Sequence, residues 1–231
     1  MRGWYGRLRR HRGGTRLFWV GILLLAWEVG VKVSGISPLL IPPVEDVAAA
    51  LWENLFHGEL FLQAGVSLGL IALGLAASAA LALLLTLLCE ISPVLGDGID
   101  SLCAIAHPLP GVALLPLVIL WFGAGTWAAA ALVVHSCLWP LLLNLRAGFG
   151  AVPPVLRDVG RNLSMGRAAL GLQILLPASR SYLLSGAKIG WARAWRALIS
   201  AGMIFGAIGG PGGMGWFLFK QRSFMNTAGL F

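Results

Sequence analysis

Three basic residues in an apolar stretch near the C-terminus are the first candidates for chemistry. Lys188, Arg193 and Arg196 lie in the run Tyr182–Phe205, which holds no acid. Charge inside a membrane span is costly and marks a functional site by default. Arg193 and Arg196 are three residues apart and share a helix face, with Trp195 between them at an angle. Lys188, Arg193, Trp195 and Arg196 are therefore candidates for an anion-attracting solute pathway.

The same residues have a structural alternative. Lys188 can snorkel to the membrane interface, and the two arginines can bond carbonyls of neighbouring helices. Glu28, in the first apolar run, is a candidate partner for one of the three cations. Four other tryptophan rings are expected to be interfacial anchors rather than solute contacts: Trp121, Trp127, Trp139 and Trp191.

A second candidate is the polar, arginine-rich segment 146–181, which separates two apolar runs. A plain connection between helices needs only about 2–8 residues. Pro153 and Pro154 suit a first helical turn, where a missing N–H costs nothing. The pattern predicts a polar helix–turn–helix, and we interpret it as a docking surface for a cytoplasmic partner.

Within this segment, residues 155–163 predict one short amphipathic helix and residues 167–175 a second. Leu176-Pro177 is expected to end the second helix. Ser164 would cost roughly 1 kcal/mol in a left-handed turn, so Gly166 is expected to take that conformation.

Other kinds of site find no support in the sequence. The glycine-rich stretch Gly206–Gly215 lacks the Gly-Lys-Ser/Thr of a nucleotide-binding loop, so we expect no ATPase site in this chain. The three cysteines and four histidines are scattered without metal-ligand spacing, which predicts no metal and no catalytic residue. An intramembrane enzyme would need a convergent nucleophile, base or metal set, and the His and Asp residues are far apart in the expected topology.

Composition then defines the class of protein. Of the 231 residues, 58% are apolar and 11% are charged, with a mean hydropathy of +0.84, against about 25% charged residues in soluble domains. The net charge of +8 does not indicate nucleic acid, because the basic residues gather in two segments beside apolar runs, which is the positive-inside pattern of an inner-membrane protein. The sequence therefore predicts an all-α, multi-pass protein of the bacterial inner membrane.

Hydropathy predicts five spans, and a sixth is expected but is not in this sequence. Residues 1–16 form a basic segment, which places the N-terminus in the cytoplasm, and residues 17–231 form one transmembrane domain. The small residues Gly186 and Gly190, spaced by four, are expected to serve ordinary helix packing rather than a dedicated dimer contact. The five spans are Leu17–Val33, about Ala64–Leu88, Gly111–Phe122 (short unless it begins in the preceding loop), Trp127–Leu145 and Tyr182–Phe205.

The arginine-rich segment resembles the EAA loop of ABC-importer permeases. That motif reads Glu-Ala-Ala, three residues, Gly, nine residues, Ile-x-Leu-Pro. Here Asp158-Val159-Gly160 and Ser164 occupy the first positions at the same spacing, and Ile174, Leu176 and Pro177 agree outright.

Three further segments resemble the nitrate/sulfonate/taurine/bicarbonate-type permeases of the same family. Residues 41–47 are similar to an external Leu-Pro-x-Pro element, and residues 185–195 to a Gly-x-Arg stretch that ends in Ala-Trp. The run Ala113–Gly125, with its Leu-Trp-Phe-Gly, is the most specific of the three. The resemblance extends from about Ile41 to the end of the chain.

The resemblance implies a type I ABC importer permease fold of five to six transmembrane helices with cytoplasmic coupling helices. Its implied partners are two cytoplasmic ATP-binding subunits, an external solute-binding protein and a second permease copy, and its solute is a small anion. Segment 146–181 would be a lever that ATPase closure moves, so that the spans rock between inward and outward access. The implied ATPase-coupling residues are Arg157, Asp158, Val159, Gly160, Arg161, Ser164, Gly166, Ile174, Leu176 and Pro177.

One alternative function remains open at the level of sequence. A passive anion channel would use the same cationic stretch, but it would need no cytoplasmic docking segment.

Overall fold

The computed structural model describes residues 12–205 and 212–231, and every regular element in these ranges is a helix. The chain divides into two compact units. The first comprises Met1–Phe61 with Leu218–Phe231, and the second is Leu62–Phe217. The helical content of the described ranges confirms the all-α prediction. Residues 1–11 of the basic N-terminal segment, and residues 206–211 of the glycine-rich stretch, lie outside the described ranges.

The first unit contains α2 (Arg12–Ser34) and α3 (Val44–Phe56). Glu28 connects them: one carboxylate oxygen lies 2.5 Å from Lys32 Nζ, and the other accepts the backbone N–H of Val44 at 2.8 Å. Val44 begins α3, so the carboxylate satisfies a donor that the helix itself leaves unbonded. Within its own unit, Glu28 therefore has partners one helical turn away and at the start of α3, and its pairing with a cation of Tyr182–Phe205 stays a prediction.

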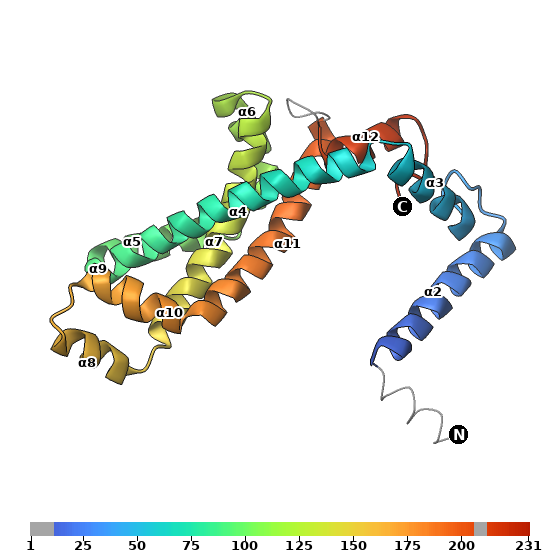
Figure 1. Cartoon of the computed structure of the whole chain (residues 1–231). Coiled ribbons are helices and arrows are strands. Elements are labelled where there is room, and N and C mark those ends of the chain that lie inside the picture. Colours follow the sequence, from blue (N-terminus) through green and yellow to red (C-terminus); the bar gives the residue numbers. More distant parts are fainter. Residues whose placement is uncertain (1–11, 206–211) are drawn as a thin grey trace, which may run out of the picture. The chain divides into compact units, whose positions relative to one another are not determined.

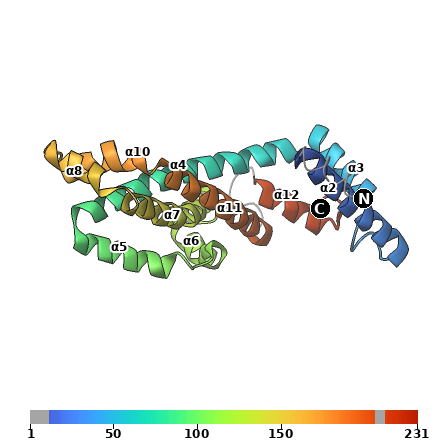
Figure 2. The same ribbon diagram turned by 90° about the horizontal axis from the view of Figure 1, so that it is seen from below.

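The second unit is built around two long helices, α7 (Thr126–Gly150) and α11 (Arg180–Phe205), which run side by side (Figures 1 and 2). The short helices α8 to α10 lie at one end of this unit, and α6 lies toward the other end (Figure 1). The remaining elements are α4 (Leu60–Ile91), α5 (Pro93–Ala106), the 3-10 turn η1 (Gly111–Leu114), α6 (Leu115–Phe122), α8 (Pro154–Asn162), α9 (Arg167–Leu170), the π-turn η2 (Gly171–Leu175), α10 (Leu176–Ala178) and α12 (Met214–Ser223).

Three of the described helices are long and apolar enough to cross a membrane on their own: α2 from Gly13, α4 and α7. The third predicted span, Gly111–Phe122, is helical over these residues but does not have the length of a crossing by itself. Residues 111–122 form the second half of a pair with α5, and the two halves meet at an angle of 93°. The 26 residues of α11 are enough to cross a bilayer, but this helix carries four basic residues and is not one of these three.

The face that α4 buries consists mostly of small or polar residues, with Ile71 as its one large apolar side chain. Its buried positions recur every three or four residues, so they form one stripe. The Ser78 hydroxyl donates to Gly74 O at 2.7 Å and lies 3.2 Å from Val134 O on α7. Gln63 and Ser67 accept the backbone N–H groups of Gly213 and Met214, where α12 begins. Small and hydroxyl-bearing residues are typical of helix contacts in lipid. An apolar side chain there is no more stable against protein than against the lipid tails, so close backbone packing and hydrogen bonds drive the contact.

α7 and α11 approach each other closely at glycine positions. A Cβ on Gly186 would lie 3.1 Å from Leu141 Cα and from Pro140 O, and one on Gly190 would lie 3.3 Å from Cys137 Cα. These are backbone atoms, which cannot move aside cheaply. The prediction that Gly186 and Gly190 serve ordinary helix packing is confirmed.

Replacement of Gly186 by leucine should separate α7 from α11. The expected cost is about 1–3 kcal/mol of stability, as for other overpacked interfaces, seen as a lower midpoint of thermal unfolding in detergent. Gly65→Leu on α4 is the matched control, because a Cβ there meets no atom within 4 Å. Equal midpoints for the two variants would contradict the packing described.

Candidate functional site

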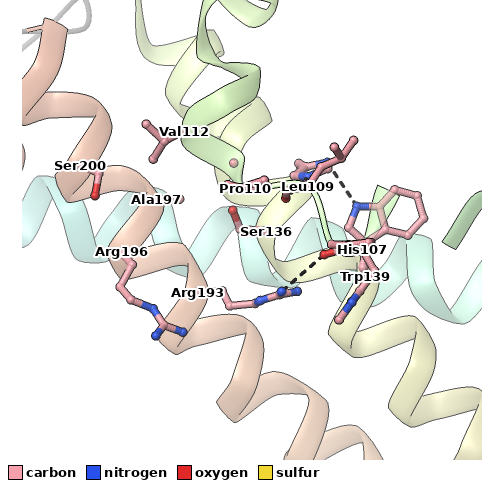
Figure 3. Close-up of a pocket in the computed structure, with 13 residues that line it drawn as sticks. His107, Leu109, Pro110, Val112, Ser136, Trp139, Arg193, Arg196, Ala197 and Ser200 are labelled. Carbon is pink, nitrogen blue, oxygen red and sulfur yellow. Dashed lines mark hydrogen bonds between the residues drawn. The ribbon is translucent and has the colours of Figure 1, made fainter. Parts of the chain in front are cut away.

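A cavity of about 330 Å³ lies where α5 and η1 meet α7 and α11 (Figure 3). Arg193 and Arg196 of α11 both line it, as does Ser136 of α7, and none of its lining residues is acidic. The lining residues are His107, Pro108, Leu109, Pro110, Gly111, Val112, His135, Ser136, Trp139, Arg193, Arg196, Ala197 and Ser200. The cavity therefore combines two positive charges and two hydroxyl groups with an apolar wall, which suits a small anion.

The cavity exists because the chain breaks its helix at residues 107–110. Residues 107–110 lie between α5 and η1, so the carbonyls of His107 and Leu109 need partners other than helical N–H groups in these apolar surroundings. His135 Nε2 lies 3.4 Å from Leu109 O, and Arg193 Nη2 donates to His107 O at 3.4 Å. α7 and α11 thus each supply one side chain that bonds a backbone carbonyl of the break.

Trp139 fixes the tautomer of His135. The indole N–H can only donate, and it lies 3.2 Å from His135 Nδ1, so Nδ1 is the acceptor. The hydrogen of the neutral ring is then on Nε2, where it can be donated to Leu109 O. Trp139 is only 8% exposed. Its expected role as an interfacial anchor is therefore wrong, because its ring is buried and its N–H is bonded inside the protein.

The structure brings together two of the four predicted pathway residues and separates the other two. Arg193 and Arg196 line the cavity, whereas Lys188 and Trp195 do not. Lys188 is exposed, two helical turns before Arg196 on α11. Trp195 packs against the main core cluster, with its ring centroid 6.3 Å from that of Trp191.

Sequence reasoning did not find His107, His135 or Ser136. Two signals could have pointed to them. Prolines two residues apart in an apolar run indicate a broken helix, and a His with a Trp four residues later on one helix can form a hydrogen-bonded pair.

The arginine-rich segment forms the expected pair of short helices with two differences. Ser164 itself takes the left-handed conformation, with φ of +53°, while Gly166 is extended at φ of −64° and precedes α9. The expectation for Gly166 is wrong. Met165 N–H bonds Gly160 O across this turn at 3.0 Å, and this bond helps to hold Ser164 in its costly conformation.

The second helix does not end at Leu176-Pro177 as expected. Helical turns continue through α10 to Ala178, because the chain widens into the π-turn η2 before the proline. The Leu176 N–H bonds Gly171 O, five residues back. This wider turn changes the register of the hydrogen bonds just before Pro177, which has no N–H to contribute.

α8 packs on the second helix through Gly160. A Cβ at Gly160 would meet Leu170 Cδ1 and lie 3.1 Å from Ile174 Cδ1. Ile174 and Leu176 in turn pack, half-buried, against the core cluster formed by Leu145, Phe149, Val152 and Leu175. The segment is thus anchored to α7, and Pro177 remains exposed.

The charged residues of α8 divide into two kinds. Arg157 is turned toward the protein, where it bonds Glu90 and Phe149 O, both at 2.9 Å. Asp158 and Arg161 form a long pair at 3.4 Å, and their side chains are 61% and 73% exposed. Val159 is also exposed. One side of α8 is therefore free to meet a partner.

His135→Leu should loosen the break at residues 107–110, since it leaves the Leu109 carbonyl without its donor. The cost of about 1–3 kcal/mol for such an unsatisfied group should appear as faster amide hydrogen exchange in peptides that cover residues 105–115. His135→Gln, which can still donate, should exchange more slowly than the leucine variant. His57→Leu, at an exposed position, is the control. Identical exchange in the leucine and wild-type proteins would contradict the role given to His135.

Comparison with known proteins identifies a family of membrane transport proteins. Residues 82–229 match the binding-protein-dependent transport system inner membrane component family. The nitrate import permease protein of Synechocystis sp. is 25% identical over 196 residues, which cover 82% of this chain and 71% of that protein. The taurine transport system permease protein of Escherichia coli is 26% identical over 190 residues, or 80% and 69% of the two chains.

The bicarbonate transport system permease protein of Synechococcus elongatus is 26% identical over 163 residues, which cover 71% of this chain and 59% of that protein. These relatives are permease subunits rather than ATPases. The family match covers more than half of the chain and includes both the cavity and the helices α8 to α10. This chain therefore belongs to the binding-protein-dependent transport system inner membrane component family of ABC permeases, as a multi-pass inner-membrane protein.

Proposed function

We propose that this chain is the transmembrane subunit of an ATP-driven importer for a small anion. Two cytoplasmic partner subunits bind and hydrolyse ATP, an external binding protein delivers the solute, and a second copy of this chain completes the pathway. The observation that carries the proposal is the exposed, charged side of α8, held in place by packing at Gly160. A plain connection between two spans would need neither this length nor a packed pair of short helices.

The docking surface consists of Asp158, Val159 and Arg161. A helix that presents opposite charges beside an exposed apolar side chain suits a protein groove better than lipid headgroups. The segment around it, from Gly160 through Ser164 and Gly166 to Pro177, acts as its rigid base.

The solute pathway uses the cationic surface of α11. Lys188 and Arg196 are exposed on this helix, and charge exposed to hydrocarbon is expensive. Water in a pathway between two copies of the chain would remove that cost. The relatives named for nitrate, taurine and bicarbonate transport share anionic oxygen atoms as the feature to be recognised. Arg193 and Arg196 are suited to bind such oxygens through paired N–H donors.

The orientation follows from the basic residues. Arg157, Arg161 and Arg167 lie on α8 and α9, at the same end of the second unit as the start of α5 (Figures 1 and 2). The positive-inside rule assigns this end to the cytoplasm. With the α4–α5 turn and segment 146–181 inside, the N-terminus is also assigned to the cytoplasm.

Charge reversal at Asp158 tests the docking surface. Tagged chain purified from its native membranes in mild detergent should carry an ATPase, identified by mass spectrometry through its phosphate-binding loop and by ATP hydrolysis. Asp158→Lys should reduce the recovered ATPase at least about tenfold, because like charges would then meet across the contact. Glu53→Lys makes the same change at an exposed position on α3 and should have no effect. Recovery of the chain alone, without any ATPase, would favour the passive channel instead.

Arg196→Gln tests the solute pathway. The assay is uptake by proteoliposomes that contain the purified complex and its binding protein, with labelled nitrate, bicarbonate and taurine as probes. Loss of one charge-assisted hydrogen bond should weaken the apparent affinity for the transported anion by about tenfold. Arg196→Lys retains the charge and should lose less. Unchanged uptake by the glutamine variant would remove Arg196 from the pathway.

A further inference from the structure

Two arginines of the α8–α9 segment bind the end of α4, Arg157 in a half-buried position and Arg167 at the surface. Arg157 Nη1 lies 2.9 Å from Glu90 Oε2, and its Nη2 donates to Phe149 O at 2.9 Å. Arg167 donates to the carbonyl of Ile91, the last residue of α4. The C-terminal end of a helix carries partial negative charge and unbonded carbonyls, so both arginines are bound where cations are favoured.

The burial of the Arg157–Glu90 pair separates it from the docking surface. Arg157 and Glu90 side chains are each 25% exposed, against 61% for Asp158 and 73% for Arg161. Ion pairs at the surface contribute little to stability. Arg157, in contrast, bonds one carboxylate and one backbone carbonyl, and these two partners hold it in one geometry. The neighbouring residues Arg157 and Asp158 therefore have different surroundings.

The end of α4 leads directly to the cavity. Ser92 caps α5, which begins at Pro93, and α5 continues for 14 residues to the break that forms the cavity wall. At 1.5 Å per residue this helix is roughly 21 Å long. Arg146 on α7 holds α5 near its middle, through an ion pair with Asp100 at 2.5 Å. A displacement of the α4–α5 turn would therefore reach His107–Pro110 through one rigid helix.

We infer that Glu90 and Arg157 form a coupling clasp, which transmits motion of α8 to the α4–α5 turn and so to the cavity. The inference rests on the proposed function, since α8 moves only if an ATPase docks on it. In this arrangement Arg157 is a positioning residue: it touches neither solute nor ATPase, and Arg167 supports it at the same helix end. Loss of the clasp would leave ATP hydrolysis intact while disconnecting it from the cavity.

A charge swap tests the clasp directly. The variants are Arg157→Glu, Glu90→Arg and the two changes together, in a background where Cys89, Cys103 and Cys137 are replaced by alanine. Ser200→Cys, at the cavity, reports its opening through the rate of labelling by a membrane-impermeant maleimide, with and without ATP plus vanadate. The complex with its co-purified ATPase is used throughout, so no knowledge of the solute is needed.

Each single variant should reduce the ATP-dependent change in labelling rate by about tenfold, and the double variant should restore it to within about threefold. The ATPase should still co-purify with the single variants and still hydrolyse ATP. Asp97→Arg, which reverses the charge of an exposed residue on α5, is the matched control and should behave as wild type.

Two results would overturn the clasp. One is an unchanged response in Arg157→Glu. The other is a double variant that stays as impaired as the singles, which would assign Arg157 to the docking surface. If the parent protein itself shows no bound ATPase and no ATP-dependent labelling, it is the proposed function that fails rather than the clasp alone.

Discussion

α7 and α11 lie so close together that their contact has room for little but glycine at Gly148, Gly186 and Gly190. A Cβ on Gly148 would lie 2.8 Å from Tyr182 Cβ, and the other two face backbone atoms of α7. In lipid, such close approach replaces the hydrophobic effect as the source of helix association. The cavity depends on this contact, because it brings His135 and Ser136 of α7 opposite Arg193 of α11.

The second constraint is that polar groups in apolar surroundings must be bonded. Arg193 and His135 bond the carbonyls of the break, Ser78 bonds α7, and Gln63 and Ser67 bond the start of α12. Each of these side chains is costly to bury alone and favourable once paired. The polar residues of the apolar helices therefore specify which helices meet, and where.

The α8–α10 segment combines a fixed inner side with a free outer side. Its inner side is packed at Gly160 and bonded through Arg157 and Arg167. Its outer side keeps Asp158 and Arg161 available. The lever proposed for this segment would need both properties, because a loose segment would absorb the motion of a partner and a fully buried one would not contact it.

Sequence alone determined the helical class, the membrane setting, the α8 helix and the cationic character of α11, because these follow from composition and local periodicity. It could not determine which charges face inward. Arg157 and Arg161 are four residues apart and share a helix face, yet one bonds Glu90, 67 positions away, while the other is exposed. Likewise, only the tertiary structure joined His135 and Trp139 to the break at Pro108–Pro110, and packed the half-buried Trp195 against the core. Periodicity defines the faces of a helix, but the neighbour that each face meets is decided by contacts between residues far apart in the chain.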